Sequence, residues 1–136
     1  MISAYTDASV SNNTAVVSCV VLSDDSFIGY DYHTFSGVSR SFVAEILGVM
    51  RGISYLRRLD VDINGATIYT DSDKVMQLLH RPSERLKGST GRKIKHIKKQ
   101  CGNYGISVKH CVGHQHNSNP NNIADRICNS VMRSQV

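Results

Sequence analysis

Two copies of nearly the same short segment contain the first residues that could do chemistry. Tyr5-Thr6-Asp7-Ala8 lies near the start of the chain, and Tyr69-Thr70-Asp71-Ser72 lies at its middle. Each copy puts an aspartate, a poor strand residue, directly after residues suited to a strand. Adjacent carboxylates repel each other unless a proton or a metal ion lies between them. Either aspartate alone is most simply a turn residue, but two such strands side by side predict a cation site.

Two further acids lie at the boundaries of predicted elements. Glu45 lies near the start of a predicted helix, and Asp125 lies in the first turn of the last one, after Gly113-His114. Each is also explained by a favourable interaction with a helix N-terminus. Hydrolysis of a phosphodiester by two divalent ions requires the ions about 3.5–4 Å apart, and magnesium prefers oxygen ligands. Three or four carboxylates from separate elements meet that requirement.

Hydrophobic periodicity predicts the elements that position these acids. Period-two or continuous apolar runs indicate strands, and apolar residues at three- and four-residue spacing indicate helices. The expected strands are the segment that ends at Asp7, then 15–22, 27–35, 66–70 and 106–112. The expected helices begin at about Ser41, after a cap at Asp71 or Ser72, at Arg92, and in a last segment bearing Ile123, Ile127 and Val131. Turns or links are expected at 9–14, 23–26, 88–91 and 113–122.

This order predicts an α/β fold with a mixed five-stranded sheet. Three antiparallel strands come first, strand–helix crossovers follow, and helices flank the sheet. At 136 residues the chain is expected to form a single domain, 1–136. No apolar run approaches the length of a membrane span, and no secretory leader is expected. The four cysteines are scattered singly, so we expect reduced thiols and a cytoplasmic protein.

Positive charge is concentrated in one segment of the chain. Residues 81–109 carry nine lysines and arginines against one glutamate, a net +8, whereas the remainder carries seven basic against ten acidic residues, a net −3. A basic segment on a mildly acidic body indicates a polyanionic partner on one face. The alternative is an ordinary solvated helix face. If the partner is nucleic acid, the candidate contacts are Lys93, Lys95, Lys98 and Lys99.

The acids in this order resemble those of ribonuclease H of the type 1 superfamily. The resemblance covers nearly the whole chain, and its strength lies in the joint pattern because no single piece is specific. The matching pieces are Tyr-Thr-Asp-Ala-Ser (5–9), Ala-Glu-Ile-Leu-Gly-Val-Met-Arg-Gly-Ile (44–53), Ile-Tyr-Thr-Asp-Ser (68–72), Val-Gly-His (112–114) and Asn-Asn-Ile-Ala-Asp (121–125).

The resemblance implies an endonuclease that cleaves the RNA strand of RNA/DNA hybrids and leaves 5′-phosphate and 3′-hydroxyl ends. It implies two Mg²⁺ ions, with Mn²⁺ as a substitute. Asp7 would contact both ions, Glu45 and Asp71 would share the leaving-group ion, and Asp125 would hold the water-activating ion. His114 would help to move protons or release product, although nearby His116 leaves that assignment open.

The sequence departs from the family at positions that affect substrate binding. Val10-Ser11-Asn12-Asn13-Thr14 replaces the usual glycine-rich turn. Ser41 and Phe42 stand where many members have paired asparagines that read the minor groove of the hybrid. The nucleic-acid contacts expected near the acids are therefore Ser9, Arg40 and Ser41.

Several other functions remain open from the sequence. A different nuclease on the same scaffold, such as a junction resolvase or a DNase, would use the same acids. A non-catalytic nucleic-acid-binding module would be expected to lack one of them, and a structural protein would leave the basic segment unexplained. Zinc is disfavoured, because its potential ligands follow no established spacing; these ligands are Cys101, His110, Cys111, His114 and His116. We expect a monomer.

Overall fold

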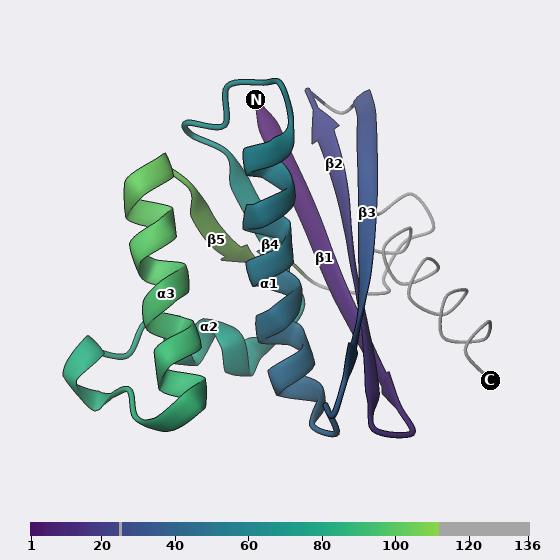
Figure 1. Ribbon diagram of the computed structural model, residues 1–136. Helices are drawn as coiled ribbons and strands as arrows, with labels where there is room; N and C mark the ends of the chain where they lie inside the picture. Colours follow the sequence, from purple (N-terminus) through teal and green to yellow (C-terminus); the bar gives the residue numbers. More distant parts are fainter. Residues whose placement is uncertain (25, 112–136) are drawn as a thin grey trace.

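A mixed five-stranded sheet runs through the computed structural model, which describes residues 1–24 and 26–111 (Figure 1). Its strands are β1 (Ile2–Ser11), β2 (Thr14–Ser23), β3 (Ser26–Ser36), β4 (Thr67–Thr70) and β5 (Ser107–His110). Its helices are α1 (Ser41–Arg58), α2 (Asp73–Leu79), the short 3₁₀ helix η1 (Ser83–Arg85) and α3 (Gly88–Tyr104). The predicted loop 113–122 and the last predicted helix lie outside the described residues.

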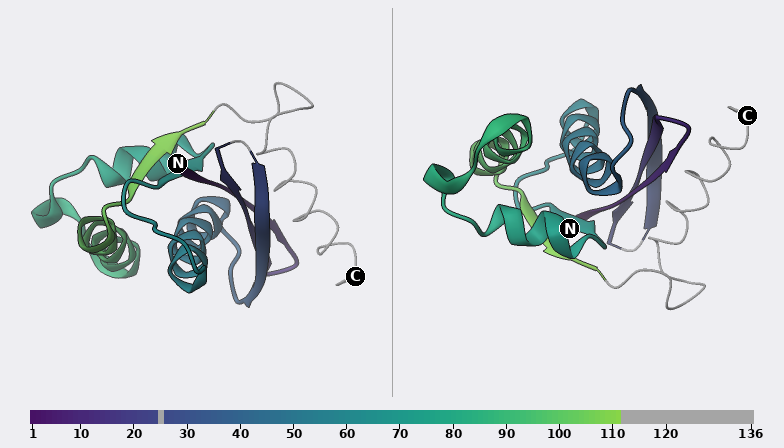
Figure 2. Two further views of the ribbon diagram at one scale, coloured as in Figure 1. Left: turned by 90° about the horizontal axis from the view of Figure 1, so that it is seen from above. Right: turned by 90° about the horizontal axis from the view of Figure 1, so that it is seen from below.

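The strand order is β3-β2-β1-β4-β5. β1, β2 and β3 form an antiparallel meander, whereas β4 pairs in parallel with β1, and β5 pairs in parallel with β4. α1 and α3 lie side by side on one face of this sheet (Figure 2). The mixed sheet with flanking helices confirms the fold class predicted from the sequence.

The first hairpin is longer than the sequence indicated. The polar segment 9–14 was predicted to be a turn, but β1 continues to Ser11 and only Asn12 and Asn13 make the turn. Both asparagines have positive φ, 50° and 61°. A two-residue hairpin turn of type I′ requires that conformation, and asparagine tolerates it. Asp7 is therefore in the interior of a ten-residue strand instead of at its end.

α1 packs closely on β1 and β2 because its contact face combines branched side chains with two glycines. Ile46 and Val49 are fully buried in the core. A Cβ at Gly52 would lie 3.0 Å from the Thr6 methyl group, and one at Gly48 would lie 3.6 Å from the Asp7 carbonyl oxygen. The small residues thus let the helix backbone approach β1, which brings the N-terminal half of α1 close to Asp7.

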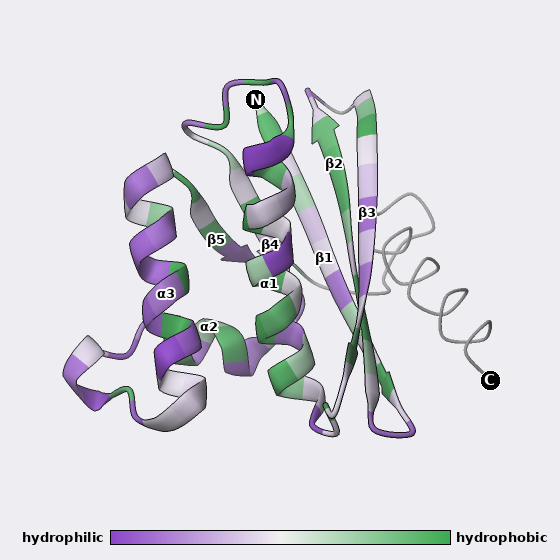
Figure 3. Cartoon of the chain, in the orientation of Figure 1, coloured by the Kyte–Doolittle hydropathy of each residue, from purple (hydrophilic) through white to green (hydrophobic). Residues whose placement is uncertain are grey.

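The segment 88–91 was predicted to be a flexible link, but it forms the first turn of α3. Its hydrogen bond runs from the Gly91 backbone N–H to the Lys87 carbonyl, 3.0 Å. A Cβ at Gly91 would lie 2.6 Å from the carbonyl carbon of Leu86, so only glycine allows the turn to close against that buried residue. The tertiary contact with Leu86 overrides the low helix propensity of glycine. Figure 3 shows the polar residues of α3 on its outer side.

Within the described residues, no helix combines the length and the apolar character that crossing a membrane would require.

Gly91→Ala should destabilise the protein by about 1–3 kcal/mol, because the added methyl group overlaps the Leu86 backbone. Urea unfolding monitored by circular dichroism measures this. Gly102→Ala in the same helix is the control, since a Cβ there meets nothing within 4 Å. That change should stabilise by up to about 1 kcal/mol. Equal effects of the two substitutions would contradict the close approach at Gly91.

Candidate metal centre

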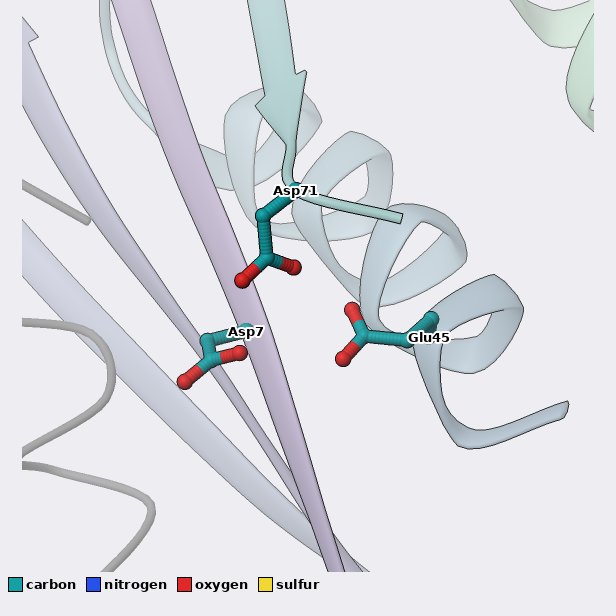
Figure 4. A group of neighbouring side chains, drawn as sticks. All are labelled: Asp7, Glu45 and Asp71. Carbon is teal, nitrogen blue, oxygen red and sulfur yellow. The ribbon is translucent and has the colours of Figure 1, made fainter. Parts of the chain in front are cut away.

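Asp7, Glu45 and Asp71 meet at one point although they come from β1, α1 and the residue after β4 (Figure 4). One carboxylate oxygen of each acid lies within 4.8 Å of the corresponding oxygens of the other two. Asp7 is buried, and Glu45 and Asp71 are half-buried. Among residues 1–24 and 26–111 this is the one group of three or more acidic, histidine or cysteine side chains close enough to share a metal ion.

The register of β1 and β4 brings the two aspartates together. Tyr5 pairs with Tyr69 in this parallel ladder, so a continuation of the same register puts Asp7 level with Asp71. The Thr6 hydroxyl donates to the Tyr69 carbonyl at 3.2 Å and holds the two strands together beyond their last pair. The repeated Tyr-Thr-Asp of the sequence is therefore a spatial pair.

The chain that follows Asp71 is fixed by two short-range hydrogen bonds. The Ser72 backbone N–H donates to the Thr70 hydroxyl, and the Ser72 hydroxyl accepts from the Val75 backbone N–H, both at 3.2 Å. Ser72 is thus the N-cap of α2, which is one of the two caps that the sequence left open. Asp71 lies between an ended strand and a capped helix, so its backbone has little freedom to move away from Asp7.

Glu45 lies in the second turn of α1, three residues before Gly48, which packs on the Asp7 backbone. Burial is the main cause that raises the pKa of Glu45 to about 9, followed by the charges of Asp7 and Asp71. A hydrogen bond from the Ala8 backbone N–H acts in the opposite direction. Glu45 Oε2 is buried and has no hydrogen-bond partner among the described residues.

These properties fit a divalent cation. Glu45 has a buried carboxyl oxygen without a donor among the described residues, and its pKa is raised first by burial and then by the neighbouring charges; both properties indicate that positive charge would stabilise the ionised carboxylate. The three carboxylates supply only oxygen ligands, and such a set suits magnesium or manganese better than softer metals. Without metal, a proton on Glu45 relieves part of the repulsion.

Two stacked tyrosines lie beside the acids. The rings of Tyr5 and Tyr69 have centroids 4.8 Å apart and an interplanar angle of 17°. Since side chains alternate along a strand, Tyr5 is on the same face of β1 as Asp7, two residues further on. The stack brings the two strands together next to the centre, and the repeated Tyr-Thr-Asp was the signal that could have predicted it.

Of the other site residues predicted near the acids, three lie in the described part of the chain. Ser9 is on the same face of β1 as Asp7 and is half-buried, whereas Arg40 and Ser41 are exposed at the start of α1, one turn before Glu45. His114, His116 and Asp125 lie outside the described residues. Their roles stay predictions.

The four lysines of α3 do not share one face of the helix. Lys98 lies in a cleft with residues of α2 and β5, and its ammonium donates to the Arg81 carbonyl. Lys93, five residues earlier on the helix, donates to the Ser89 hydroxyl at 2.7 Å. Lys95 and Lys99 are exposed. That all four lysines contact the same nucleic acid therefore stays a prediction, and their arrangement does not support it.

Removing the charge of Glu45 should stabilise the metal-free protein. The raised pKa of Glu45 means that the folded state holds a proton that the unfolded state has released, so stability falls as pH rises from about 4.5 to about 9. In chelator at about pH 8, Glu45→Gln should raise Tm by several degrees, since about 1 kcal/mol corresponds to roughly 3–5 °C at this size. The same substitution should also make the fall of Tm with rising pH less steep.

Glu84→Gln is the matched control, because Glu84 is exposed and distant in sequence from the acids. That variant should keep the pH dependence of the parent. Millimolar Mg²⁺ should stabilise the parent more than Glu45→Gln. A parent whose Tm is unaffected by Mg²⁺, or a Glu45→Gln variant less stable than the parent in chelator, would contradict a metal centre here.

Comparisons with known proteins identify the family and the fold. The RNase H family model matches residues 1–133. RNase H1 from Halobacterium salinarum is 17% identical with a TM-score of 0.71, and 98% of each chain is covered. LC11-RNase H1, isolated from compost by a metagenomic approach, is 17% identical with a TM-score of 0.80 over 98% of this chain and 96% of that one.

Part of a viral protein has the same fold. The protease–reverse transcriptase of prototype foamy virus is 18% identical with a TM-score of 0.74 over 95% of this chain, which corresponds to 20% of the viral chain. No curated protein matches. The family match extends over nearly the whole length, and the mixed five-stranded sheet is the one that the sequence predicted; the chain belongs to the RNase H family.

Proposed function

We propose that this protein hydrolyses the RNA strand of RNA/DNA hybrids and leaves 5′-phosphate and 3′-hydroxyl ends. Membership of the RNase H family supports this activity. LC11-RNase H1 has been solved in complex with an RNA/DNA hybrid, and its TM-score to this chain in that structure is 0.76. The observation that carries the proposal is the meeting of three carboxylates from β1, α1 and the end of β4 within 4.8 Å.

Each acid has a distinct part in this proposal. Asp7, the most buried, would contact both of two Mg²⁺ ions, with Mn²⁺ as a substitute, and Glu45 and Asp71 would complete the site on the leaving-group side. Asp125 would hold the second ion, and His114 would transfer protons or help product leave. The ions, when bound, would activate water and stabilise the leaving 3′-oxygen.

The remaining proposals concern the molecule as a whole. The family match over residues 1–133 supports the interpretation of 1–136 as a single domain. A monomeric state and a cytoplasmic location are also proposed.

A cleavage assay with four labelled substrates tests the activity. RNA/DNA hybrid, RNA duplex, DNA duplex and single strands are each incubated with Mg²⁺ or chelator, and the ends of the products are mapped. Cleavage of the RNA strand of the hybrid, only with metal, is expected. Cleavage of DNA duplex or branched DNA instead would favour a DNase or a resolvase, and binding without cleavage would favour a non-catalytic module.

Asp71→Asn should reduce hybrid cleavage to roughly a few per cent of the parent or less, because it removes a ligand charge from the metal centre. Asp73→Asn is the control two residues further along the chain. Asp73 is exposed and pairs with His110 at 3.1 Å, so its loss should leave most of the activity. Asp7→Asn should behave like Asp71→Asn. Substantial activity in either variant would contradict the metal assignment.

His114→Ala should slow turnover without ending it, since the proposed role is proton transfer or product release. His116→Ala is the paired variant that decides which histidine has the role. Single-turnover and steady-state rates separate chemistry from release. A loss as complete as that of Asp7→Asn would contradict this role.

A further inference from the structure

The backbone pairing between β1 and β4 ends before it reaches the two aspartates. Asp7 and Asp71 both come after the last pair, and Asp71 lies beyond the end of β4 at Thr70. In the described part of the chain, no ladder pair of their own therefore fixes the separation of the aspartates. The pairs of this ladder are Ser3 with Thr67, Ala4 with Ile68, and Tyr5 with Tyr69.

The hydrogen bonds next to Asp71 fix its position relative to its own segment. The Ser72 backbone N–H donates to the Thr70 hydroxyl, and the Val75 backbone N–H donates to the Ser72 hydroxyl. Both bonds stay within residues 70–75, so the distance across to β1 depends on contacts between the strands. The charges of Asp7 and Asp71 repel each other across that distance unless a cation or a proton lies between them.

Tyr69 makes two contacts across the strands at the last ladder pair. Its ring stacks on the Tyr5 ring, with centroids 4.8 Å apart and an interplanar angle of 17°. Its carbonyl accepts a hydrogen bond from the Thr6 hydroxyl at 3.2 Å. Both tyrosines are half-buried, and Thr6 is fully buried. Side-chain contacts thus hold the strands together at the point where the ladder stops.

The tyrosine stack and α1 act on opposite faces of the β1–β4 pair. A Cβ at Gly52 of α1 would lie 3.0 Å from the Thr6 methyl group and 3.7 Å from the Ile68 Cδ1, so the helix covers both strands there. Side chains alternate along a strand, so the tyrosines, which are next to Thr6 and Ile68 in sequence, are on the other face. Helix packing therefore holds one face of the strand pair, and the stack holds the other.

Without the stack, the repulsion between the aspartates would be opposed on one face only. Stacked aromatic rings prefer a limited range of centroid distances, about 4.5–7 Å. An aliphatic side chain of similar bulk would fill the space without setting such a distance. The stack therefore restrains the ends of the two strands more narrowly than ordinary apolar packing would.

The separation of the acids matters most to a small cation. Magnesium binds oxygen at about 2.0–2.1 Å in nearly ideal octahedral geometry, which brings neighbouring ligand oxygens to roughly 2.9 Å from each other. Calcium binds oxygen at about 2.3–2.6 Å and accepts a more variable geometry. One ligand oxygen of each of the three acids lies within 4.8 Å of the others. Drawing these oxygens together costs more free energy for magnesium than for calcium, and the difference grows if the strands can separate.

We propose that the Tyr5–Tyr69 stack restrains the separation of Asp7 and Asp71 and thereby strengthens binding of the small Mg²⁺ ion relative to the larger Ca²⁺ ion. The two tyrosines are positioning residues, because they act through the aspartates. Only the choice of Mg²⁺ as the ion of this centre rests on the proposed function. Ion selectivity then depends in part on residues outside the carboxylates themselves.

Metal titrations of the chelator-treated full chain, without nucleic acid, test the stack. The rise of Tm with the concentration of Mg²⁺ or of Ca²⁺ gives an affinity for each ion. Tyr69→Leu keeps an apolar side chain but removes the ring. It should weaken Mg²⁺ binding about tenfold, as is typical when residues that orient metal ligands are changed. Ca²⁺ binding should weaken less than about threefold, so the ratio of Mg²⁺ to Ca²⁺ affinity should fall by about threefold or more.

Two comparisons separate positioning from packing. Tyr69→Phe keeps the stacked ring and should bind both ions within about twofold of the parent. Tyr104→Leu removes a half-buried tyrosine of α3 that packs against the core and contacts Arg57. It should lower the Tm without metal but keep the affinity ratio of the parent. Equal weakening of Mg²⁺ and Ca²⁺ binding by Tyr69→Leu, or the same change of ratio in Tyr104→Leu, would overturn the proposal.

Tyr5→Leu tests the same stack from the other strand. It removes the partner ring and leaves the Tyr69 carbonyl, which accepts from the Thr6 hydroxyl, in place. It should therefore reproduce the change of affinity ratio expected for Tyr69→Leu, and it decides the question if Tyr69→Leu does not fold. A Tyr5→Leu variant with the affinity ratio of the parent would contradict a role of the stack.

The stack and the proposed function fail separately. In the cleavage assay, Tyr69→Leu should need about tenfold more Mg²⁺ for half-maximal rate, with a KM for hybrid at saturating Mg²⁺ within about twofold of the parent. A parent that cleaves no hybrid, together with the expected change of affinity ratio in Tyr69→Leu, would overturn the activity and keep the stack. A parent that cleaves hybrid while Tyr69→Leu keeps the parent's ratio would keep the activity and overturn the stack.

Discussion

Repulsion among three carboxylates, one buried and two half-buried, is the constraint on which the rest of this structure depends. Two unit charges at about 4.8 Å repel by on the order of 3–4 kcal/mol when the effective dielectric constant is about 20. No fold would hold Asp7, Glu45 and Asp71 together by preference. The arrangement persists because each acid is attached to an element whose position is determined by other contacts, and a proton on Glu45 relieves part of the repulsion until a cation replaces it.

Those other contacts belong to the hydrophobic core. Thr6 and Asp7 are adjacent on β1, and Thr6 is fully buried while its methyl group lies against the contact face of α1 near Gly52. Any shift of β1 by one residue would expose the apolar side chains of Ile2 and Ala4 and bury their polar neighbours. The register that the core requires is therefore the register that brings the aspartates level. The free energy of packing holds the site in a geometry that its own charges oppose.

Sequence reasoning succeeded where a local pattern and a tertiary requirement coincide. The two Tyr-Thr-Asp segments are on neighbouring strands, and Glu45 is on the helix that packs there, because hydrophobic periodicity indicates both elements. It failed at 9–14 and 88–91, where polar residues and glycines were interpreted by their average propensities. At 9–14, Asn12 and Asn13 adopt the positive φ that the hairpin turn requires, although neither is a glycine. At 88–91, the close contact between Gly91 and Leu86 outweighs the low helix propensity of glycine.

The arrangement of the basic residues was beyond sequence reasoning for a related reason. A charge count gives density along the chain and says nothing of proximity in space. Lys93 and Lys98 have different partners, the Ser89 hydroxyl and the Arg81 carbonyl. Arg81, Arg85 and Lys87 line one pocket with Lys74 and Phe42, and no spacing in the sequence connects these residues.

The proposed substrate is a polyanion, so the acidic centre needs positive charge before it can receive one. Three carboxylates alone would repel a phosphate. A divalent cation bound among Asp7, Glu45 and Asp71 would offset much of their negative charge at the point where the scissile phosphate would lie. Salt would weaken attraction between the substrate and exposed cations of the surface more than it weakens metal binding at these acids, because exposed charges are screened more than buried ones.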